Sequence, residues 1–409
     1  MRVRRISGKS PEISQWQNQL VRIKNASQFC SFEMKKIKIV NRMNWYEIKN
    51  IDSIDSPTLV VYKERVRENI RRLKSMKDVA HLRPHVKTNK IAEVCDMMLD
   101  EGITKFKCAT IAEAEMLGMI DAPDVLLAYQ PVGPKVNRLL RLVKQYPATH
   151  FSCVIDEFEN AKHISEIFAI ENLVLDVYID LNTGMNRTGI TPSEKALELF
   201  NRCDELGGIN IIGLHVYDGH IRDTDVATRK QRTDEAFQAI IELTAKIKSQ
   251  TEKEMRVVAG GSPTFPVHAQ RTSIECSPGT FVFWDWGYKN LTPDEPFDFA
   301  ALVISRVISV VDANTICTDL GHKSVAAENP LEKRVYFLNA PDAEPIGQSE
   351  EHLVLKVPDA SKFKVGDVLY GVPIHICPTV ALYEKAVIVE NNEAVDEWRV
   401  IARDKKITV

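Results

Sequence analysis

The amino-acid sequence predicts an α/β protein, a (β/α)8 TIM barrel followed by a C-terminal β domain. From about residue 56 onward, short β-branched or apolar runs alternate with segments of helical periodicity, which is typical of βα units and a parallel sheet. Eight such runs occur over roughly 220 residues, which fits a closed barrel better than a smaller doubly wound sheet. After about residue 295 the long helical segments stop while the apolar runs continue.

The first expected elements are a lead-in strand at 58–62 and a helix at 64–76. The eight barrel strands are expected near 81–87, 103–108, 124–129, 149–155, 172–181, 210–217, 255–260 and 272–276. Helical segments fit between most of them, at 91–100, 111–119, 134–145, 157–169, 193–205 and 230–250. Parallel strands need such long crossover connections, so the alternation favours a parallel barrel.

A chain of 409 residues is too long for one small domain. Residues 1–43 carry ten Lys and Arg against two Glu, and we predict a basic N-terminal extension that could be disordered. It could be a basic arm, a transit-like sequence or an over-extended start ahead of Met43. The barrel with its lead-in strand is expected at 44–295. A C-terminal β domain is expected at 296–409, with strands near 301–311, 335–338, 352–357, 368–372 and 386–389.

The composition is that of an ordinary globular protein, with 44% hydrophobic residues, 27% charged residues and a net charge of -3. No global positive field favours nucleic acid as a partner. No stretch reaches the length of about 20 apolar residues that a membrane helix needs, so we expect no membrane partner either. The eight cysteines are scattered without paired spacing, which favours free thiols and a cytoplasmic location.

Lys87 stands at the carboxyl end of the first expected barrel strand, in the run Pro84-His85-Val86-Lys87-Thr88. Active sites in such barrels form at this end. A lone lysine at a strand end is usually only solvated, as we expect for Lys90. Lys87 is singled out by the residues at the corresponding ends of the later strands.

Glycines occur directly after three later strands, at the same end of the barrel. The runs are Asn182-Thr183-Gly184-Met185-Asn186-Arg187-Thr188-Gly189, Tyr217-Asp218-Gly219-His220 and Gly260-Gly261-Ser262-Pro263-Thr264. Glycine lets backbone N–H groups approach an anion closely, and the late strands of a barrel commonly bind phosphate. A lysine beside a phosphate cradle suits pyridoxal 5′-phosphate (PLP), so the sequence predicts this cofactor.

These runs resemble the alanine-racemase-like fold-type III PLP enzymes, and the resemblance covers roughly residues 44–409. Within that family the sequence is most similar to the branch of D-threonine aldolase and D-serine dehydratase. The resemblance implies that Lys87 forms the Schiff base and that Arg187 contacts the cofactor ring or its phenolic oxygen. It also implies that the phosphate is held by Tyr217 and by the loop with Gly260, Gly261, Ser262 and Thr264. His220 could serve as a base or belong only to a turn with Gly219.

The same branch carries a His-x-Cys or His-x-Asp metal pair, which this sequence matches at His375 and Cys377. We expect the pair in a strand, where residues two apart point to the same side. A thiolate and an imidazole favour zinc, whereas an aspartate in the second position would favour manganese. Two protein ligands leave positions open, so a substrate β-hydroxyl could bind the ion.

The predicted function is a PLP- and metal-dependent lyase of the D-threonine aldolase type, which converts D-threonine to glycine and acetaldehyde. A D-serine dehydratase remains open, because Cys377 favours it and the same residues support both reactions. An amino-acid racemase and a non-catalytic PLP-binding protein are further alternatives, and both would lack the metal pair. The D-amino acid substrate and a homodimer are expectations from the resemblance alone.

Overall fold

The structure is a computed structural model that describes residues 43–409, of which residues 45–409 form one unit. The predicted basic extension lies outside the described residues apart from Met43. Among the residues that are described, none of the helices has the length and apolar character of a membrane-spanning segment.

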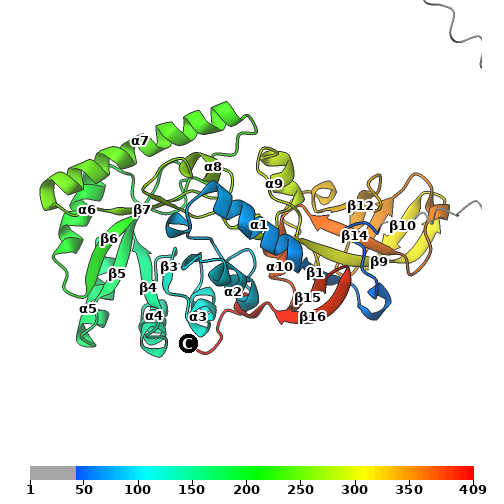
Figure 1. The fold of residues 1–409 in the computed structure, drawn as a ribbon, viewed down its shortest axis with the longest axis horizontal. Coiled ribbons are helices and arrows are strands. Elements are labelled where there is room, and N and C mark those ends of the chain that lie inside the picture. Colours follow the sequence, from blue (N-terminus) through cyan, green and yellow to red (C-terminus); the bar gives the residue numbers. More distant parts are fainter. Residues whose placement is uncertain (1–42) are drawn as a thin grey trace, which may run out of the picture. The chain divides into compact units, whose positions relative to one another are not determined.

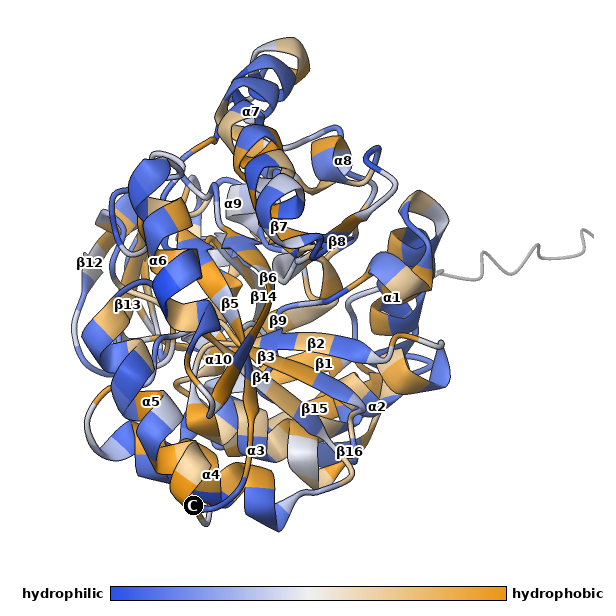
Figure 2. Cartoon of the chain, turned by 90° about the vertical axis from the view of Figure 1, so that its left-hand side faces the viewer, coloured by the Kyte–Doolittle hydropathy of each residue, from blue (hydrophilic) through white to orange (hydrophobic). Residues whose placement is uncertain are grey.

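A seven-stranded parallel sheet runs in sequence order from β2 to β8. Its strands are β2 (Lys105–Cys108), β3 (Asp124–Leu127), β4 (His150–Ile155), β5 (Leu175–Leu181), β6 (Ile209–Val216), β7 (Arg256–Ala259) and β8 (Ile274–Cys276). Helices cover the outer face and side chains fill the inner one, so the strands are apolar along most of their length. Figure 2 shows these hydrophobic strands inside helices whose outward faces are hydrophilic.

The prediction of a regular strand at 81–87 is wrong. Leu82 and His85 instead form isolated bridges, with Cys276 of β8 and with Lys107 of β2. Pro84 has no N–H group to contribute to a ladder, which limits regular pairing here. The segment nevertheless connects the first and last strands of the sheet, and the predicted barrel with a separate β domain is confirmed.

The helices around the barrel are α1 (Lys63–Met76), α2 (Ala92–Asp100), α3 (Ile111–Met119), α4 (Pro134–Gln145), α5 (Phe158–Ile170), α6 (Glu194–Asp204), α7 (Val226–Thr251) and α8 (Phe265–His268). Local capping sets several of their starts. At α3 the Thr110 hydroxyl accepts a hydrogen bond from the Glu113 amide at 3.1 Å, and the Glu113 carboxylate accepts one from the Ala109 amide at 2.6 Å. Helix α7 begins four residues before its predicted start, because Asp225 caps it through the Thr228 amide at 2.8 Å.

The C-terminal domain is built on a nine-stranded sheet with the main order β12-β13-β10-β9-β1-β15-β16, and β14 pairs with β9 and β11. The lead-in strand, β1, pairs antiparallel with β9 and parallel with β15, so it belongs to this sheet. Figure 1 shows the two domains, with the short helices α9 (Trp286–Leu291) and α10 (Ile376–Val380) where they meet. The domain boundaries at residues 44 and 296 stay predictions. The strands are β1 (Thr58–Tyr62), β9 (Ala301–Asp312), β10 (Thr315–Thr318), β11 (Val335–Phe337), β12 (Glu344–Gln348), β13 (Leu353–Lys356), β14 (Val368–Pro373), β15 (Lys385–Glu390) and β16 (Glu393–Arg399).

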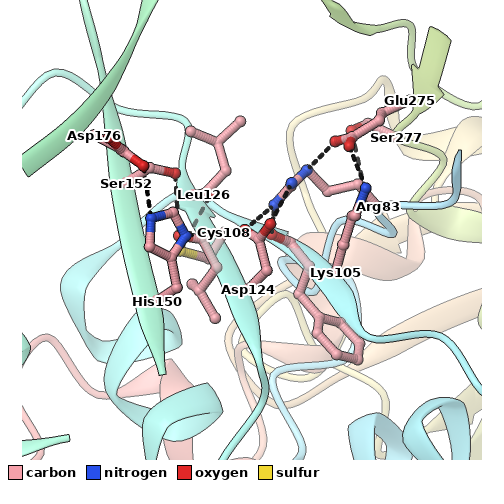
Figure 3. A network of polar contacts seen from close by, with 12 residues as sticks. Arg83, Lys105, Cys108, Asp124, Leu126, His150, Ser152, Asp176, Glu275 and Ser277 are labelled. Atoms are coloured by element: carbon pink, nitrogen blue, oxygen red, sulfur yellow. Dashed lines mark hydrogen bonds and ion pairs between the residues drawn. The ribbon is translucent and has the colours of Figure 1, made fainter. Parts of the chain in front are cut away.

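A network of paired charges fills the barrel at the amino-terminal ends of its strands (Figure 3). The buried Arg83 guanidinium donates to both carboxylate oxygens of Asp124, at 2.7 and 3.0 Å, and to Glu275 at 2.7 Å. Lys105 also pairs with Glu275, and the ring of His150 lies 2.8 Å from Asp176. Every charged group named here has an opposite charge in contact, which is the condition under which buried charges are tolerated.

Candidate active site

Lys87 lies in the turn after the bridge at His85, at the carboxyl end of the barrel. Its backbone amide donates to the His85 Nδ1 at 3.3 Å, which ties the turn to the preceding segment. The side chain is half-buried, and its Nζ is 5.6 Å from the centre of the Tyr217 ring. The lysine predicted from the sequence therefore reaches the residue that comes directly after β6.

Three cations surround the Tyr217 ring. Besides Lys87, the Nζ of Lys107 lies 5.7 Å from the ring centre, and the guanidinium carbon of Arg187 lies 5.0 Å from it. Within the described part of the chain, none of the three makes an ion pair. A cluster of cations without carboxylate partners is suited to bind an anion.

Lys107 was missed in the sequence. It is fully buried on β2, and burial, followed by the charge of Lys87, lowers its pKa to about 7. The signal was the alternation along this short strand: Lys105 and Lys107 are two apart and therefore share the face that points into the barrel. The expected strand at 103–108 alone does not show which way its lysines point.

Behind Lys107 lies a buried histidine–aspartate pair to which the sequence motifs assigned no role. His215 Nδ1 is 2.7 Å from the Asp180 carboxylate, and His215 Nε2 is 3.5 Å from the Nζ of Lys107. Because a carboxylate only accepts hydrogen bonds, Nδ1 carries the proton. Burial lowers the pKa of His215, so its neutral ring presents Nε2 to the lysine as an acceptor.

The glycine turn after β7 provides backbone donors at the same end of the barrel. Gly260 adopts a positive φ of 83°, and a Cβ there would lie 2.8 Å from the ring of His268. Among the described residues the backbone amides of Ser262 and Thr264 have no acceptor. Free amides beside unpaired cations fit a phosphate group.

Side chains hold this turn in place. The Thr264 hydroxyl accepts from the Gly261 amide at 3.3 Å and donates to the buried Asp218 at 2.7 Å. Asp218 also accepts from His268 Nε2 at 2.7 Å. The Ser262 hydroxyl accepts from the amide of Thr280 at 3.2 Å, so it joins the turn to the loop after β8. Asp218 and His268 are two further residues whose roles the sequence motifs did not indicate.

His220 packs against the loop after β5. A Cβ on Gly184, whose φ is 120°, would come within 2.8 Å of its Nε2. Its Nδ1 is buried and has no hydrogen-bond partner in the described residues. A turn alone does not require a buried ring nitrogen without a hydrogen-bond partner. The ring of His220 is therefore kept as a candidate base.

The expectation that His375 and Cys377 lie in a strand is wrong. His375 is the N-cap residue of α10, and Cys377 lies in its first turn. The two residues are nevertheless close enough for each to shift the pKa of the other. Cys377 Sγ also lies 3.2 Å from the Thr88 hydroxyl, next to Lys87. Helix α10 thus brings Cys377 to the turn that contains Lys87.

Burial disfavours charge on both members of the pair, and their mutual contact outweighs it. The pKa of His375 rises to about 9, through Cys377 and through Glu328, whose carboxylate is 2.5 Å from His375 Nδ1. The pKa of Cys377 falls below its usual value through His375 and Lys87. No group of three or more His, Cys, Asp or Glu with the geometry of a metal site occurs among residues 43–409. That His375 and Cys377 hold a metal ion therefore stays a prediction.

A pocket of about 390 Å³ adjoins the pair. It is lined by His375, Glu328 and Asn329 from the C-terminal domain, by Asp285, Gly287, Tyr288 and Leu291 around α9, and by Arg222 and Ile374. The buried Asp285 accepts from the amides of Tyr288 at 2.8 Å and Ile376 at 3.1 Å, so it fixes α9 and α10 together. Space for a small molecule thus lies beside His375.

Comparison with known proteins agrees with this architecture. Residues 61–285 match the family described as "Alanine racemase, N-terminal domain", and residues 300–389 match "Putative serine dehydratase domain". D-threonine aldolase from Arthrobacter sp. is 27% identical over 361 residues, which are 86% of this chain and 93% of the relative.

Solved structures show the same fold. D-threonine aldolase from Filomicrobium marinum aligns with a TM-score of 0.79 at 24% identity and covers 86% of this chain and 95% of its own. A cysteine-to-alanine mutant of D-threo-3-hydroxyaspartate dehydratase, described as "in the metal-free form", aligns with a TM-score of 0.75 at 20% identity. That alignment covers 85% of this chain and 97% of the dehydratase.

The barrel therefore defines the class of protein: the chain belongs to the family of the alanine racemase N-terminal domain. With its C-terminal domain it falls in the branch of the D-threonine aldolases and D-serine dehydratase-like proteins, as the sequence motifs indicated. The chain is an enzyme of this lyase branch.

Proposed function

We propose that the protein is a PLP- and metal-dependent lyase that cleaves a D-β-hydroxy amino acid, of the D-threonine aldolase type. One observation carries the proposal. Cys377, which follows His375 by two residues, lies 3.2 Å from the hydroxyl of Thr88, the residue after the half-buried Lys87. Family membership supports the cofactor, and the aldolase relative supports the reaction.

The residues at the carboxyl end of the barrel fit PLP. Lys87 would attach its aldehyde, and Arg187 would contact its ring or its phenolic oxygen. Tyr217 would help to hold its phosphate. The free amides of Ser262 and Thr264, on the turn of Gly260 and Gly261, would bind the phosphate. When bound, PLP supplies a sink for the electrons released at the substrate α-carbon.

The remaining steps of the reaction would be carried out by other side chains of the candidate site. His375 and Cys377 would hold a divalent ion, zinc or manganese, beside the substrate β-hydroxyl and lower the pKa of that hydroxyl. His220, with its unpartnered Nδ1, would take the hydroxyl proton so that the Cα–Cβ bond breaks. From D-threonine this leaves glycine and acetaldehyde.

D-serine dehydratase activity is the second candidate. The match of residues 300–389 to the serine dehydratase domain favours it, and so does the cysteine at the second ligand position. In this reaction Lys87 would take the α-proton, and the ion held by His375 and Cys377 would assist the departure of hydroxide. D-serine would then yield pyruvate and ammonia.

The test separates the two reactions by their products. Purified protein is supplied with PLP and with zinc or manganese, then incubated with D-threonine and D-serine, and with their L-isomers as controls. Glycine and acetaldehyde identify the aldolase, whereas 2-oxobutanoate or pyruvate with ammonia identifies the dehydratase. If no product forms from either D-isomer, and chelators change nothing, the lyase proposal fails.

The proposal includes a cytoplasmic location and a homodimer. The seven described cysteines are all free thiols, and six of them are buried, which is compatible with a reducing compartment. The oligomeric state can be measured by sedimentation of the loaded enzyme. A monomer that retains full activity would remove the dimer from the proposal.

A further inference from the structure

Lys107 has no role in the proposed reaction, although the burial of a lysine is energetically unfavourable. Its side chain is fully buried on β2, and no described carboxylate lies within ion-pair distance of its Nζ. The carboxylates of Asp218 and Asp180 favour its charge from a greater distance, but burial and the charge of Lys87 outweigh them. Such a group is retained where a ligand supplies the missing charge.

The backbone places Lys107 directly beside the segment of Lys87. The Lys107 amide donates to Pro84 O at 2.9 Å, and the Lys107 carbonyl accepts from the Val86 amide at 2.9 Å. The two Nζ atoms lie at nearly the same distance from the Tyr217 ring, 5.6 and 5.7 Å. A group attached at Lys87 would therefore lie within the surroundings of Lys107.

His215 and Asp180 orient the Lys107 amine from behind. The Nδ1 proton of His215 is engaged by Asp180 at 2.7 Å, which leaves Nε2 to accept one hydrogen bond from Lys107 at 3.5 Å. An ammonium has three donors, and only this one has a partner in the described chain. The other two remain available to an acceptor in the site.

The structure of PLP identifies that acceptor. The two ring carbons that flank the aldehyde-bearing carbon of PLP carry the phenolic oxygen on one side and the phosphomethyl group on the other. Attachment at Lys87 would bring these two groups near Lys107, whose backbone is hydrogen-bonded to the segment that leads to Lys87. The phosphate has its own donors in the free amides of Ser262 and Thr264.

We propose that Lys107, oriented by the His215–Asp180 pair, is a second cationic ligand of the bound cofactor and binds its phenolic oxygen together with Arg187. This inference rests on the proposed function, since it requires PLP at Lys87. It adds a buried cofactor-binding residue from β2 to the residues that the family resemblance implies.

The test measures cofactor affinity rather than turnover. Apoprotein is titrated at pH 6 with PLP and with its 3-O-methyl ether, which keeps the aldehyde and the phosphate but has no phenolate. For Lys107→Met we expect the Kd for PLP to rise about 10-fold or more, as for a lost hydrogen bond between charged groups. The Kd for the methyl ether should change by less than about twofold, because the cycle isolates the contact with the phenolic oxygen.

Lys105→Met is the matched control. Lys105 lies two residues earlier on the same face of β2, but it is paired with Glu275. Its substitution should leave the Kd of both ligands unchanged. Reduction of the wild-type complex with borohydride and peptide mapping, done first, shows whether PLP is attached to Lys87 at all.

A second variant guards against misfolding of Lys107→Met. His215→Leu keeps Lys107 but removes the acceptor that orients it, so the Kd for PLP should rise about threefold with no change for the methyl ether. Two results overturn the inference while the wild type still binds PLP: an unchanged Kd for PLP in Lys107→Met, or equal weakening of both ligands. If the wild type itself is not labelled at Lys87, the proposed function fails instead.

Discussion

Lys105 and Lys107 are the same residue type on the same face of one strand, and they meet opposite environments. Lys105, at the amino end of β2, contacts Glu275 and lies beside Arg83, Asp124 and His150 in a network where charges are paired (Figure 3). Lys107, two residues on, faces Lys87 and the Tyr217 ring and has no carboxylate partner among the described residues. The charges at the amino end of the barrel are paired with one another, whereas the three cations around Tyr217 at the carboxyl end make no ion pair in the described chain.

This difference between the two ends of the barrel indicates that the charges at one end contribute to stability and those at the other end to function. A paired buried charge costs stability when it is broken, but it has no remaining capacity for a ligand. An unpaired buried charge lowers the stability of the free protein, but it can still bind an opposite charge of a ligand. This agrees with the general arrangement of such barrels, in which the carboxyl ends of the strands bind substrates and the amino ends stabilise the fold.

Among the substitutions that test this contrast between the two ends of the barrel, the one at Lys87 is expected to have the largest effect. In Lys87→Ala, turnover of the D-amino acid substrate should fall about 1,000-fold or more, because the covalent attachment of PLP is lost and, in the dehydratase reaction, the proton-transfer group as well. The melting temperature without cofactor should stay close to that of the wild type, since Lys87 makes no ion pair in the described chain. Turnover and thermal unfolding are measured side by side. A variant that stays active but melts early would place Lys87 with the structural lysines.

Removal of the metal pair is expected to have the next largest effect. His375→Ala should lose its divalent ion on dialysis, and turnover should fall about 100-fold or more, because the ion no longer lies beside the β-hydroxyl. Metal content by elemental analysis and labelling of Lys87 are the two readouts. The label should persist, since PLP has its own site.

His163→Ala is the matched control for that experiment, because His163 is an exposed residue of α5. Its metal content and turnover should equal those of the wild type. If His375→Ala retained a full complement of metal, the pair would not be the metal site.

At the amino end the expected effect is on stability. Arg83→Met leaves Asp124 and Glu275 without their shared guanidinium, and the free energy of unfolding should fall by about 3 kcal/mol. Lys105 and His150 still face the two carboxylates, which limits the loss. Urea unfolding of the apoprotein measures it, and the Kd for PLP should not change. A loss below about 1 kcal/mol would mean that the network contributes little to stability.

His150 gives the smallest expected effect, and it depends on pH. The carboxylates of Asp124 and Asp176 raise the pKa of His150 to about 9, above its value in the unfolded chain. The contribution of the imidazolium to stability is therefore complete below about pH 6.5 and is lost as the pH rises to about 9. Because the ring is half-exposed, solvent screens the interaction and we expect less than about 1 kcal/mol.

His150→Gln should remove this part of the pH dependence. Urea unfolding at several values between pH 6 and pH 9 compares it with the wild type. If the free energy of unfolding depends on pH in the same way in the variant and in the wild type over that range, the contacts of His150 do not stabilise the fold.

The sequence predicted most of the barrel because its elements carry local signals. Helices α3 and α4 begin and end at the predicted residues, since a capping threonine precedes one and Pro134 opens the other. The segment 82–85 was wrong as a strand, because a proline in a short apolar run does not reveal how few ladder bonds will form. Strands β10, β12 and β16 were missed. Of these, β12 contains Pro345 and Gly347, which weaken its strand signal.

The residues of the candidate site likewise fall into those that the sequence motifs indicate and those that only the structure shows. The motifs around Lys87, Arg187, Tyr217, Gly260 and His375 could be read from the sequence, because each is a short run of chemically distinctive residues. Their roles stay predictions. Lys107 could not be selected, since a lysine in a four-residue strand shows its burial and its missing partner only when the strands around it are in place.

The sequence by itself determined the class of fold, the family and the lysine of interest, because strand and helix periodicity and glycine-rich turns act over a few residues. Only the tertiary structure decided that His375 and Cys377 lie at the start of a helix, that this helix reaches Thr88, and that one lysine of β2 is paired while the other is not. Those facts depend on contacts between residues separated by up to about 290 positions in the chain, such as Thr88 with Cys377. A local pattern contains no information on such distances, so the unpaired Lys107 became visible only in the assembled barrel.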